Sequence, residues 1–270
     1  MKLNFNLWPG GVPRCLTMSY DDGQVFDVRL AEIFDKNGIK GTFHLNSDFE
    51  FDCGDHHLTR ADTAAIASRH ELSLHMHTHP FPTYLPREEL IWEVEENRRR
   101  LECVAGYPLR GMSYPYGDYN EEVVKLLREM NVEYSRTTKA THAFGIPEDF
   151  LKWHPTCHHR ELEDGTLWEK FMTDRYEWAH PLLFYVWGHS FEFDRNDNWQ
   201  LIEDFCAKAG GRDDIWYATN IEIVDYVHAV KSLRMSADRT MIQNISNLDV
   251  YVSVDGEAVK LEAGKVTTLR

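Results

Sequence analysis

The sequence predicts an α/β fold, an irregular (β/α) barrel of seven or eight units that is followed by a small C-terminal β segment. Short apolar runs alternate with helix-period stretches up to about residue 232, which is typical of parallel βαβ units. Seven or eight such units suit a barrel better than a small open sheet. Polar residues also recur where the predicted strands end, and barrels of this kind carry their functional groups there.

Eight segments are the expected strands: residues 15–20, 40–46, 71–77, 110–116, 132–138, 150–156, 182–189 and 215–220. Most are short runs of apolar or aromatic side chains, as in buried strands. Two helices are clearest between them. One is expected to begin at Pro86, whose fixed φ suits the first helical position, and to stop at Gly106. The other follows Asn120, a good N-cap residue.

The pattern changes after about residue 233 to short alternating runs with no helical period. The pair Asp255-Gly256 predicts a tight hairpin within these runs. We therefore expect a barrel over residues 1–232 and a small β segment over residues 233–270. A segment of roughly 35 residues is too small to fold reliably alone.

The charge balance limits the partners of the protein. With 44 acidic and 29 basic residues the formal net charge is -15, so we expect no binding to nucleic acid or to anionic membrane surfaces. The N-terminus lacks the apolar stretch of a signal peptide, and no run of ~18 apolar residues could span a membrane. These features predict a cytoplasmic protein, although a secreted form trimmed of its signal would look the same. They do not indicate an oligomeric state.

The stretch "HELSLHMHTHP" (70–80) holds four histidines in eleven residues, at a predicted strand end. His75, His77 and His79 alternate, so they share one face if the strand continues. Neutral imidazoles are the usual nitrogen ligands of zinc-type ions, and a catalytic site adds a carboxylate and keeps one position open. The density favours a metal site, but the spacing does not decide which two of the three bind.

The stretch "SYDDG" (19–23) supplies two adjacent aspartates directly after the first predicted strand. Taken alone, it could be a polar turn in which one aspartate caps the following helix. Next to a histidine cluster it suggests a division of roles. Adjacent side chains point in different directions, so one carboxylate could bind metal while the other stays free as a base.

Together these segments resemble the first two motifs of the NodB-type polysaccharide deacetylases, carbohydrate esterase family 4. The stretches "SYPYG" (113–117) and "VWGHS" (186–190) resemble two later motifs, in the family's order, so the resemblance extends over residues 15 to 190. It implies the NodB type of irregular barrel. It also implies a metal site at Asp22, His75 and His79, a catalytic base at Asp21, a catalytic acid at His189, and substrate or oxyanion contacts at Tyr116, Pro115 and Trp187.

The resemblance implies metal-dependent hydrolysis of an acetyl amide or ester on an acetylated sugar, oligosaccharide or polysaccharide. The implied cofactor is a divalent metal ion, with zinc as the first choice, and cobalt, nickel or iron suit the same ligands. Two alternatives stay open. One is an allantoinase-like hydrolase of a small cyclic amide or ureide, and the other is a carbohydrate-binding relative without catalysis.

The sequence departs from the family pattern at three places. Ser113 stands where the family usually has the arginine that holds the base, so either Arg110 reaches the site or the base is oriented differently. The fourth motif, an aspartate and a tryptophan that orient the catalytic histidine, has its only candidate in "DRYEW" (174–178). Gly188 replaces the aliphatic residue that usually precedes the catalytic histidine.

Overall fold

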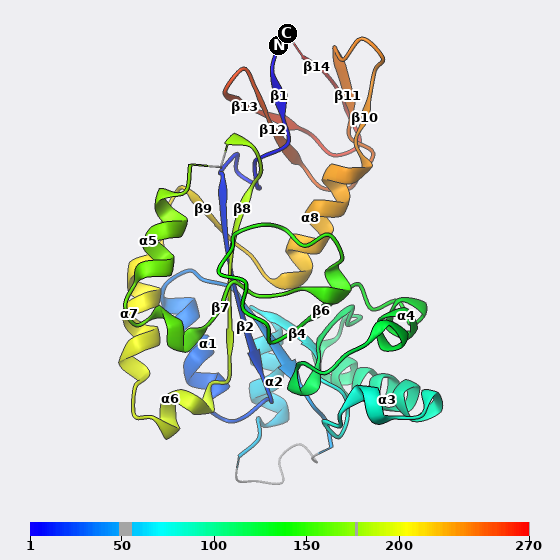
Figure 1. Ribbon diagram of the computed structural model, residues 1–270, viewed down its shortest axis with the longest axis vertical. Coiled ribbons are helices and arrows are strands. Elements are labelled where there is room, and N and C mark those ends of the chain that lie inside the picture. Colours follow the sequence, from blue (N-terminus) through cyan, green and yellow to red (C-terminus); the bar gives the residue numbers. More distant parts are fainter. Residues whose placement is uncertain (49–55, 176–177, 270) are drawn as a thin grey trace.

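A computed structural model describes residues 1–48, 56–175 and 178–269 of the chain. Its centre is a curled parallel sheet in the order β6-β5-β4-β3-β2-β8-β7, and β9 pairs with the first residues of β2 (Figure 1). The expected irregular (β/α) barrel is therefore confirmed. The strands are β2 (Arg14–Asp21), β3 (Gly41–Leu45), β4 (Glu71–Leu74), β5 (Gly111–Ser113), β6 (Tyr134–Arg136), β7 (Cys157–His158), β8 (Leu182–Gly188) and β9 (Ile215–Tyr217).

Helices lie around the outside of the curled sheet (Figure 1). They are α1 (Asp27–Lys36), α2 (Arg60–Ala67), α3 (Arg87–Ala105), α4 (Glu121–Glu129), α5 (Thr166–Thr173), α6 (Phe191–Arg195), α7 (Trp199–Ala209) and α8 (Asn220–Ser232). Both predicted helix boundaries are confirmed. Gly106 ends α3 in the left-handed conformation, with φ 75°, and the Asn120 side chain accepts a hydrogen bond from the Val123 N–H at 2.9 Å.

The inner face of the sheet is unusually polar. Strand side chains alternate between two faces, so Ser19 and Asp21 of β2 point to the same side of the sheet. Ser19 contacts His44 of β3 at 2.8 Å, and His44 pairs in register with Ser73 of β4. Apolar side chains instead fill the layer between strands and helices, as the buried Leu, Ile, Val and Phe residues of both show. The barrel thus encloses a column of polar groups that ends at Asp21.

The predicted strand over residues 150–156 is wrong in most of its length. Residues Phe150–Lys152 form a 3₁₀ turn, and the strand of this region, β7, begins only at Cys157. Pro155 has no N–H to donate to a ladder, which shortens any strand there. The segment still bridges the barrel, because Trp153 donates its N–H to Ser135 of β6 and Thr156 donates to Tyr185 of β8.

The last part of the chain forms two small antiparallel sheets, with the orders β1-β12-β13 and β10-β11-β14. Their strands are β1 (Leu3–Asn4), β10 (Arg234–Met235), β11 (Met241–Gln243), β12 (Val250–Val254), β13 (Glu257–Leu261) and β14 (Val266–Thr268). The predicted hairpin at Asp255-Gly256 is confirmed, since both residues have positive φ, 51° and 95°. The first residues of the chain pair with this segment, while the division into residues 1–232 and 233–270 stays a prediction.

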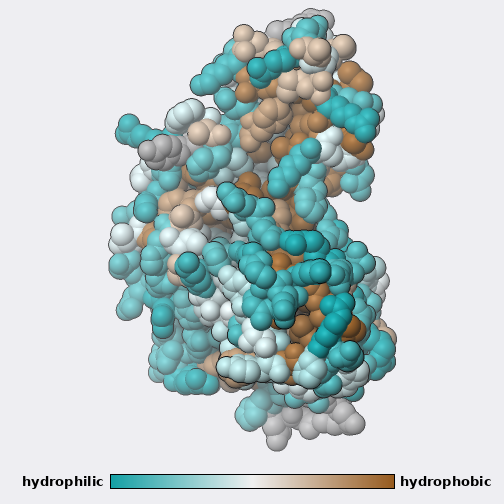
Figure 2. All heavy atoms as spheres, turned by 45° about the vertical axis from the view of Figure 1, so that its right-hand side comes forward, coloured by the Kyte–Doolittle hydropathy of each residue, from teal (hydrophilic) through white to brown (hydrophobic). Residues whose placement is uncertain are grey.

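The β segment lies at the end of the barrel where β2 and β8 begin, far from the ends of those strands (Figure 1). Side chains over the barrel are mostly hydrophilic, and hydrophobic ones are more frequent toward the β segment in the upper part of Figure 2. Exposed hydrophobic residues there include Met235, Met241, Ile245 and Val266. No helix in the described ranges is both long and apolar enough to cross a membrane.

Candidate active site

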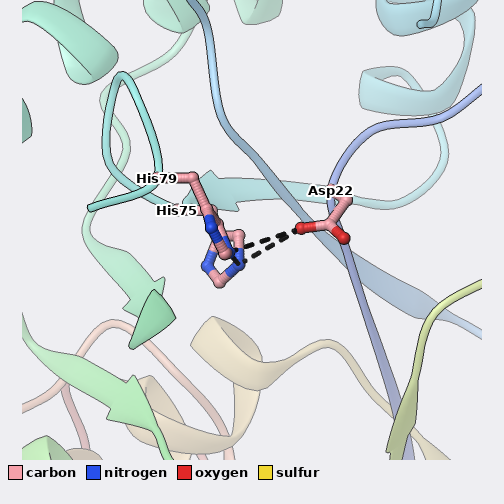
Figure 3. A group of neighbouring side chains, drawn as sticks. All are labelled: Asp22, His75 and His79. Atoms are coloured by element: carbon pink, nitrogen blue, oxygen red, sulfur yellow. Dashed lines mark hydrogen bonds and ion pairs between the residues drawn. The ribbon is translucent and has the colours of Figure 1, made fainter. Parts of the chain in front are cut away.

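Asp22, His75 and His79 come together where β2 and β4 end (Figure 3). Their ligand atoms lie within 4.8 Å of one another. The Asp22 Oδ1 atom is 3.4 Å from His75 Nε2 and 3.7 Å from His79 Nε2, and the two Nε2 atoms are 3.0 Å apart. One carboxylate and two imidazoles facing a common point are a donor set that suits a divalent transition-metal ion.

A strained turn after β2 presents Asp22 to the histidines. Asp22 has a φ of 81°, a conformation that L-residues rarely adopt, and Gly23 follows with a φ of 63°. A Cβ atom at Gly23 would lie 2.9 Å from the Leu45 side chain, so the turn needs glycine for space as well as for conformation. The turn directs Asp21 and Asp22 to different sides, as the two roles require.

Helix α3 holds the loop that carries the two histidines. The Asn97 side chain accepts a hydrogen bond from the His75 N–H at 3.0 Å, and the Glu93 carboxylate accepts from the N–H of Thr78 at 2.8 Å. Both helix residues are buried and lie four positions apart, one turn along the same face. His79 takes a left-handed backbone conformation, with φ 59°, that brings its ring back over His75. The loop is therefore fixed by the helix.

The partners of His75 select its tautomer. Its Nδ1 atom lies 2.7 Å from the Ser113 hydroxyl, whose own proton goes to Asp21, and 3.0 Å from the Ser113 carbonyl oxygen. Both oxygens are then acceptors, so this nitrogen carries the proton and donates. The Nε2 lone pair then faces Asp22 and His79, as a metal ligand requires. The other two histidines of the stretch point elsewhere: His77 contacts Ser47, and His70 lies at the start of β4 beside Asp35.

The proposed base, Asp21, is buried and ionised beside the donor set. It forms an ion pair with the guanidinium group of Arg136, and its Oδ1 accepts a hydrogen bond from the Ser113 hydroxyl at 3.1 Å. Burial by itself would raise the pKa of Asp21, but Arg136, together with the nearby His75, His44 and His189, outweighs it and holds the pKa well below the usual range. His75 Nε2 is 4.0 Å from the Asp21 carboxylate.

Arg136, and not Arg110, pairs with Asp21 in this chain, where Ser113 replaces the usual arginine of the family. It ends β6, and β6 pairs with β5 so that Arg136 is opposite Ser113. Arg110 does not reach the site, because its guanidinium pairs with Asp225 of α8 at 2.6 and 2.9 Å. Sequence reasoning missed Arg136, although it lies in the predicted strand 132–138. An arginine near the end of that predicted strand was the available signal.

His189 lies across the site from the metal donor set. Its Nε2 is 3.9 Å from Asp22 Oδ2, and its Nδ1 is 2.8 Å from the Glu192 carboxylate. Burial would lower the pKa of His189, but the hydrogen bond with Glu192 and the charges of Asp21 and Asp22 raise it above the usual value. The ring can therefore hold a proton near neutral pH.

The candidate fourth motif is not at this site. Asp174 caps the end of α5, where its carbonyl oxygen faces Arg14. Trp178 is exposed, with the ammonium group of Lys2 over its ring. Glu192, three residues after His189 on α6, occupies the place beside the histidine instead, and the i, i+3 spacing in "HSFE" is the signal that could have found it.

The three predicted substrate contacts lie around the same cluster. Tyr116 has a φ of 58° and an exposed ring that packs edge-on against His79, with ring centres 4.5 Å apart. Pro115 is buried before it, in the 3₁₀ turn Pro115–Gly117. The Trp187 ring lies under the guanidinium of Arg136 and edge-on to His189, at 4.5 and 5.7 Å. Tyr116 therefore borders the donor set, and Trp187 borders Arg136 and His189.

Comparison with known proteins identifies a related family. The family model described as polysaccharide deacetylase matches residues 11–135, the part of the chain that contains Asp21, Asp22, His75 and His79. The match places residues 11–135 among sequences like those of the polysaccharide deacetylase family. The resemblance inferred from the motifs is therefore confirmed. No curated protein matches the chain.

Among solved structures, a Mycobacterium smegmatis protein described as a polysaccharide deacetylase is 18% identical, with a TM-score of 0.62, over 85% of this chain and 96% of its own. The family 4 carbohydrate esterase of Streptomyces lividans, solved with acetate, is 11% identical, with a TM-score of 0.50, over 73% and 90%. A Streptococcus pyogenes deacetylase, also with acetate, is 17% identical, with a TM-score of 0.43, over 45% of this chain and 55% of its own. At these identities the likeness to the first two structures establishes the fold alone.

Proposed function

We propose that the protein is a metal-dependent deacetylase that hydrolyses an acetyl amide or ester on a sugar, oligosaccharide or polysaccharide. The observation that carries the proposal is the convergence of five groups at one end of the barrel. Asp22, His75 and His79 form a donor set, with the ionised Asp21 on one side and the proton-holding His189 on the other. An acid and a base on two sides of an electrophilic centre suit hydrolysis of an acyl bond.

The donor set fits a divalent ion, because the Nδ1 proton of His75 is fixed outward and its Nε2 lone pair is free to coordinate. Such an ion supplies Lewis-acid chemistry, by acidifying water and polarising a carbonyl group. The chain supplies the proton transfers. Asp21, kept ionised by Arg136, accepts a proton from the attacking water. His189 gives its Nε2 proton to the departing nitrogen or oxygen.

The rim of the site favours a sugar over a small cyclic ureide. The Phe81 and Tyr116 rings are stacked, with centres 3.9 Å apart, and both are exposed beside His79. Tyr84 is 82% exposed and packs edge-on against Phe81. Flat aromatic faces at an open rim suit sugar rings, which present apolar C–H faces, whereas a small cyclic ureide would need a closed polar pocket.

A substrate panel tests the proposal. The metal-loaded protein is incubated with acetylated chito-oligosaccharides, acetyl-xylan and cyclic ureides, and acetate and ring-opened products are measured. We expect acetate from at least one acetylated sugar. Release of ring-opened ureide alone would replace the proposed function by the allantoinase-like one. Sugar binding without any product would identify a carbohydrate-binding protein instead.

Metal binding has its own test. We expect Asp22→Ala to lose stoichiometric metal, measured by elemental analysis after dialysis, because it removes the carboxylate of the donor set. The matched control is Asp213→Ala, an exposed aspartate in the turn before β9, which should keep the metal. Full metal content in Asp22→Ala would show that the ligand set is wrong.

A further inference from the structure

Three histidine rings surround the carboxylate of Glu192. The Oε1 atom lies 2.8 Å from His189 Nδ1. The Oε2 atom lies 3.3 Å from His158 Nε2 and 3.2 Å from His159 Nε2. His158 and His159 are buried at the junction of β7 and the turn that follows it, and a ring nitrogen of His158 lies within 4.8 Å of one of His189. One oxygen of the carboxylate therefore faces His189, and the other faces His158 and His159.

The tautomer of His158 decides whether this cluster is a metal site or a hydrogen-bond network. Its Nδ1 atom accepts a hydrogen bond from the Arg160 N–H at 3.3 Å, so Nδ1 carries no proton. The proton of the neutral ring is then on Nε2, the atom that faces Glu192. A metal ligand would need a lone pair at that atom. His158 thus donates to Glu192, and the cluster is built as a hydrogen-bond network.

His159 is the second histidine at the Oε2 atom of Glu192. Burial lowers the pKa of His159 to about 4, so the ring is neutral near pH 7 and approaches Glu192 with Nε2. The ring packs on Phe193, with centres 4.2 Å apart. A Cβ atom at Gly188 would lie 2.0 Å from His159 Nδ1, so the glycine that departs from the family pattern makes room for this ring. The His159 ring can occupy this position only because residue 188 is a glycine.

The charge of Glu192 follows from its three neighbours. Burial alone would raise the pKa of Glu192, but the hydrogen bonds from His158, His159 and His189 outweigh it and hold the pKa below the usual range. An ionised carboxylate can only accept, so His189 must carry a proton on Nδ1. Its Nε2, which points toward Asp22, is then the one ring atom where a proton can be gained or lost.

We propose that Glu192 is the positioning residue of this enzyme's acid, fixed by His158 and His159 so that His189 presents Nε2 to the departing group of the substrate. The proposal rests on the proposed function. As the acyl C–N bond breaks, its electron pair stays on nitrogen, and the nitrogen takes the Nε2 proton. Glu192 stays ionised throughout, and the departing group leaves as a neutral amine.

Glu192→Gln tests this arrangement, with Asp194→Asn, an exposed residue of the same helix, as the matched control. The Gln oxygen would face the N–H groups of His158 and His159, so its NH₂ would face His189 Nδ1 and reverse the tautomer of that ring. We expect kcat on an acetylated amino sugar to fall by roughly 10²-fold with KM nearly unchanged. An aryl acetate with a good leaving group needs no proton, so its kcat should fall by less than about 10-fold.

Gly188→Ala is the second variant. Its Cβ would displace the His159 ring, while the side chains of Glu192 and His189 stay chemically unchanged. It should show the same preference for the aryl ester, with a smaller loss on the amide. Equal losses on the amide and the ester, or none, in Glu192→Gln would overturn the proposal. So would two bound metal ions in the native protein and one in Glu192→Gln, since the cluster would then be a metal site.

A spectroscopic readout separates this proposal from the proposed function. Imidazole ¹⁵N chemical shifts of the metal-loaded protein should show a His189 that is protonated on Nδ1 in the native chain and in Asp194→Asn. In Glu192→Gln the Nδ1 proton should be lost. If the native protein releases no acetate, the deacetylase function fails, whereas an unchanged His189 tautomer in Glu192→Gln overturns the positioning role.

Discussion

Two buried carboxylates lie at opposite ends of the barrel interior and are held in opposite ways. Asp21 ends β2, at the active-site end, and its partners are the cation of Arg136 and the Ser113 hydroxyl. Glu71 begins β4, at the other end, and accepts only from neutral donors. These are the hydroxyls of Tyr134 and Thr42, at 2.6 and 3.0 Å, and the N–H of Ile221, at 2.9 Å.

The difference shows that a cation, more than the number of hydrogen bonds, decides whether a buried acid is ionised. Burial raises the pKa of Glu71 to about 7 in spite of three hydrogen bonds that lower it, whereas Arg136, with the nearby histidines, holds the pKa of Asp21 well below the usual range. Tyr134 and Arg136 lie two residues apart on β6, so one strand serves both ends. The active-site end keeps a charge for chemistry, and the other end ties β3, β4, β6 and α8 together.

The largest expected effect is on Asp21. Asp21→Asn removes the ionised base but keeps the shape of the side chain, and we expect kcat to fall by roughly 10² to 10⁴-fold with metal content unchanged. Steady-state kinetics on the acetylated sugar and elemental analysis measure the two quantities. Normal turnover would show that Asp21 is not the base, and the contrast with Glu71 would then lose its catalytic meaning.

Arg136 is the next test, because it makes the difference between the two acids. Arg136→Met leaves the Asp21 charge buried and unpaired, and we expect a loss of about 3 to 5 kcal/mol in unfolding free energy, measured by denaturant titration. We also expect kcat to fall by roughly 10 to 10²-fold, since the base is less ionised and less well held. Arg136→Lys keeps the charge and should recover part of both losses. Equal stability of Arg136→Met and the native chain would contradict the ion pair.

The side chains that we propose for the chemistry could be predicted from the sequence, but those that hold them could not. Asp21, Asp22, His75 and His79 lie in two short motifs whose geometry is fixed by a turn and a loop. Arg136 reaches Asp21 from a strand 115 positions away, and Glu192 meets His158 and His159 from another element. A supporting cation or carboxylate only needs to bring its charge close to the group that it holds. Several different elements can therefore supply it, and a local sequence pattern does not show which element does.

For the fold too, features with local sequence signals could be predicted and features that depend on distant contacts could not. The alternation of strands and helices and the caps at Gly106 and Asn120 are local signals, and they predicted the barrel and both helix boundaries. The segment 150–156 was misread because its apolar run looks like a strand. Instead of a continuous strand ladder, it makes isolated hydrogen bonds, from Trp153 to β6 and from Thr156 to β8. Their positions depend on where β6 and β8 lie in the folded barrel, which the local sequence does not show.

The smallest expected effect is at the far end of the barrel and concerns stability alone. The pKa of Glu71 is about 7 in the folded protein, against an ordinary value of 4.5, so the folded state binds the proton more tightly than the unfolded state. Its contribution is fully present below pH 4.5 and is lost as the pH rises through about 7. The loss approaches about 3 kcal/mol, from a shift of roughly two to three pKa units at 1.36 kcal/mol each.

The Glu71→Gln side chain cannot titrate, so comparing this variant with the native chain isolates the contribution of Glu71 to the pH dependence of stability. Chemical unfolding of both proteins between pH 5 and pH 8 should show the native chain losing more stability than the variant, by up to about 3 kcal/mol. Tyr134→Phe is the control, because it removes one hydrogen bond from Glu71 but keeps the carboxyl group, and its pH dependence should persist. Turnover at a fixed pH should change little in Glu71→Gln. A parallel pH dependence of the native chain and Glu71→Gln would mean that Glu71 is ionised like Asp21, and the contrast between the two ends would fail.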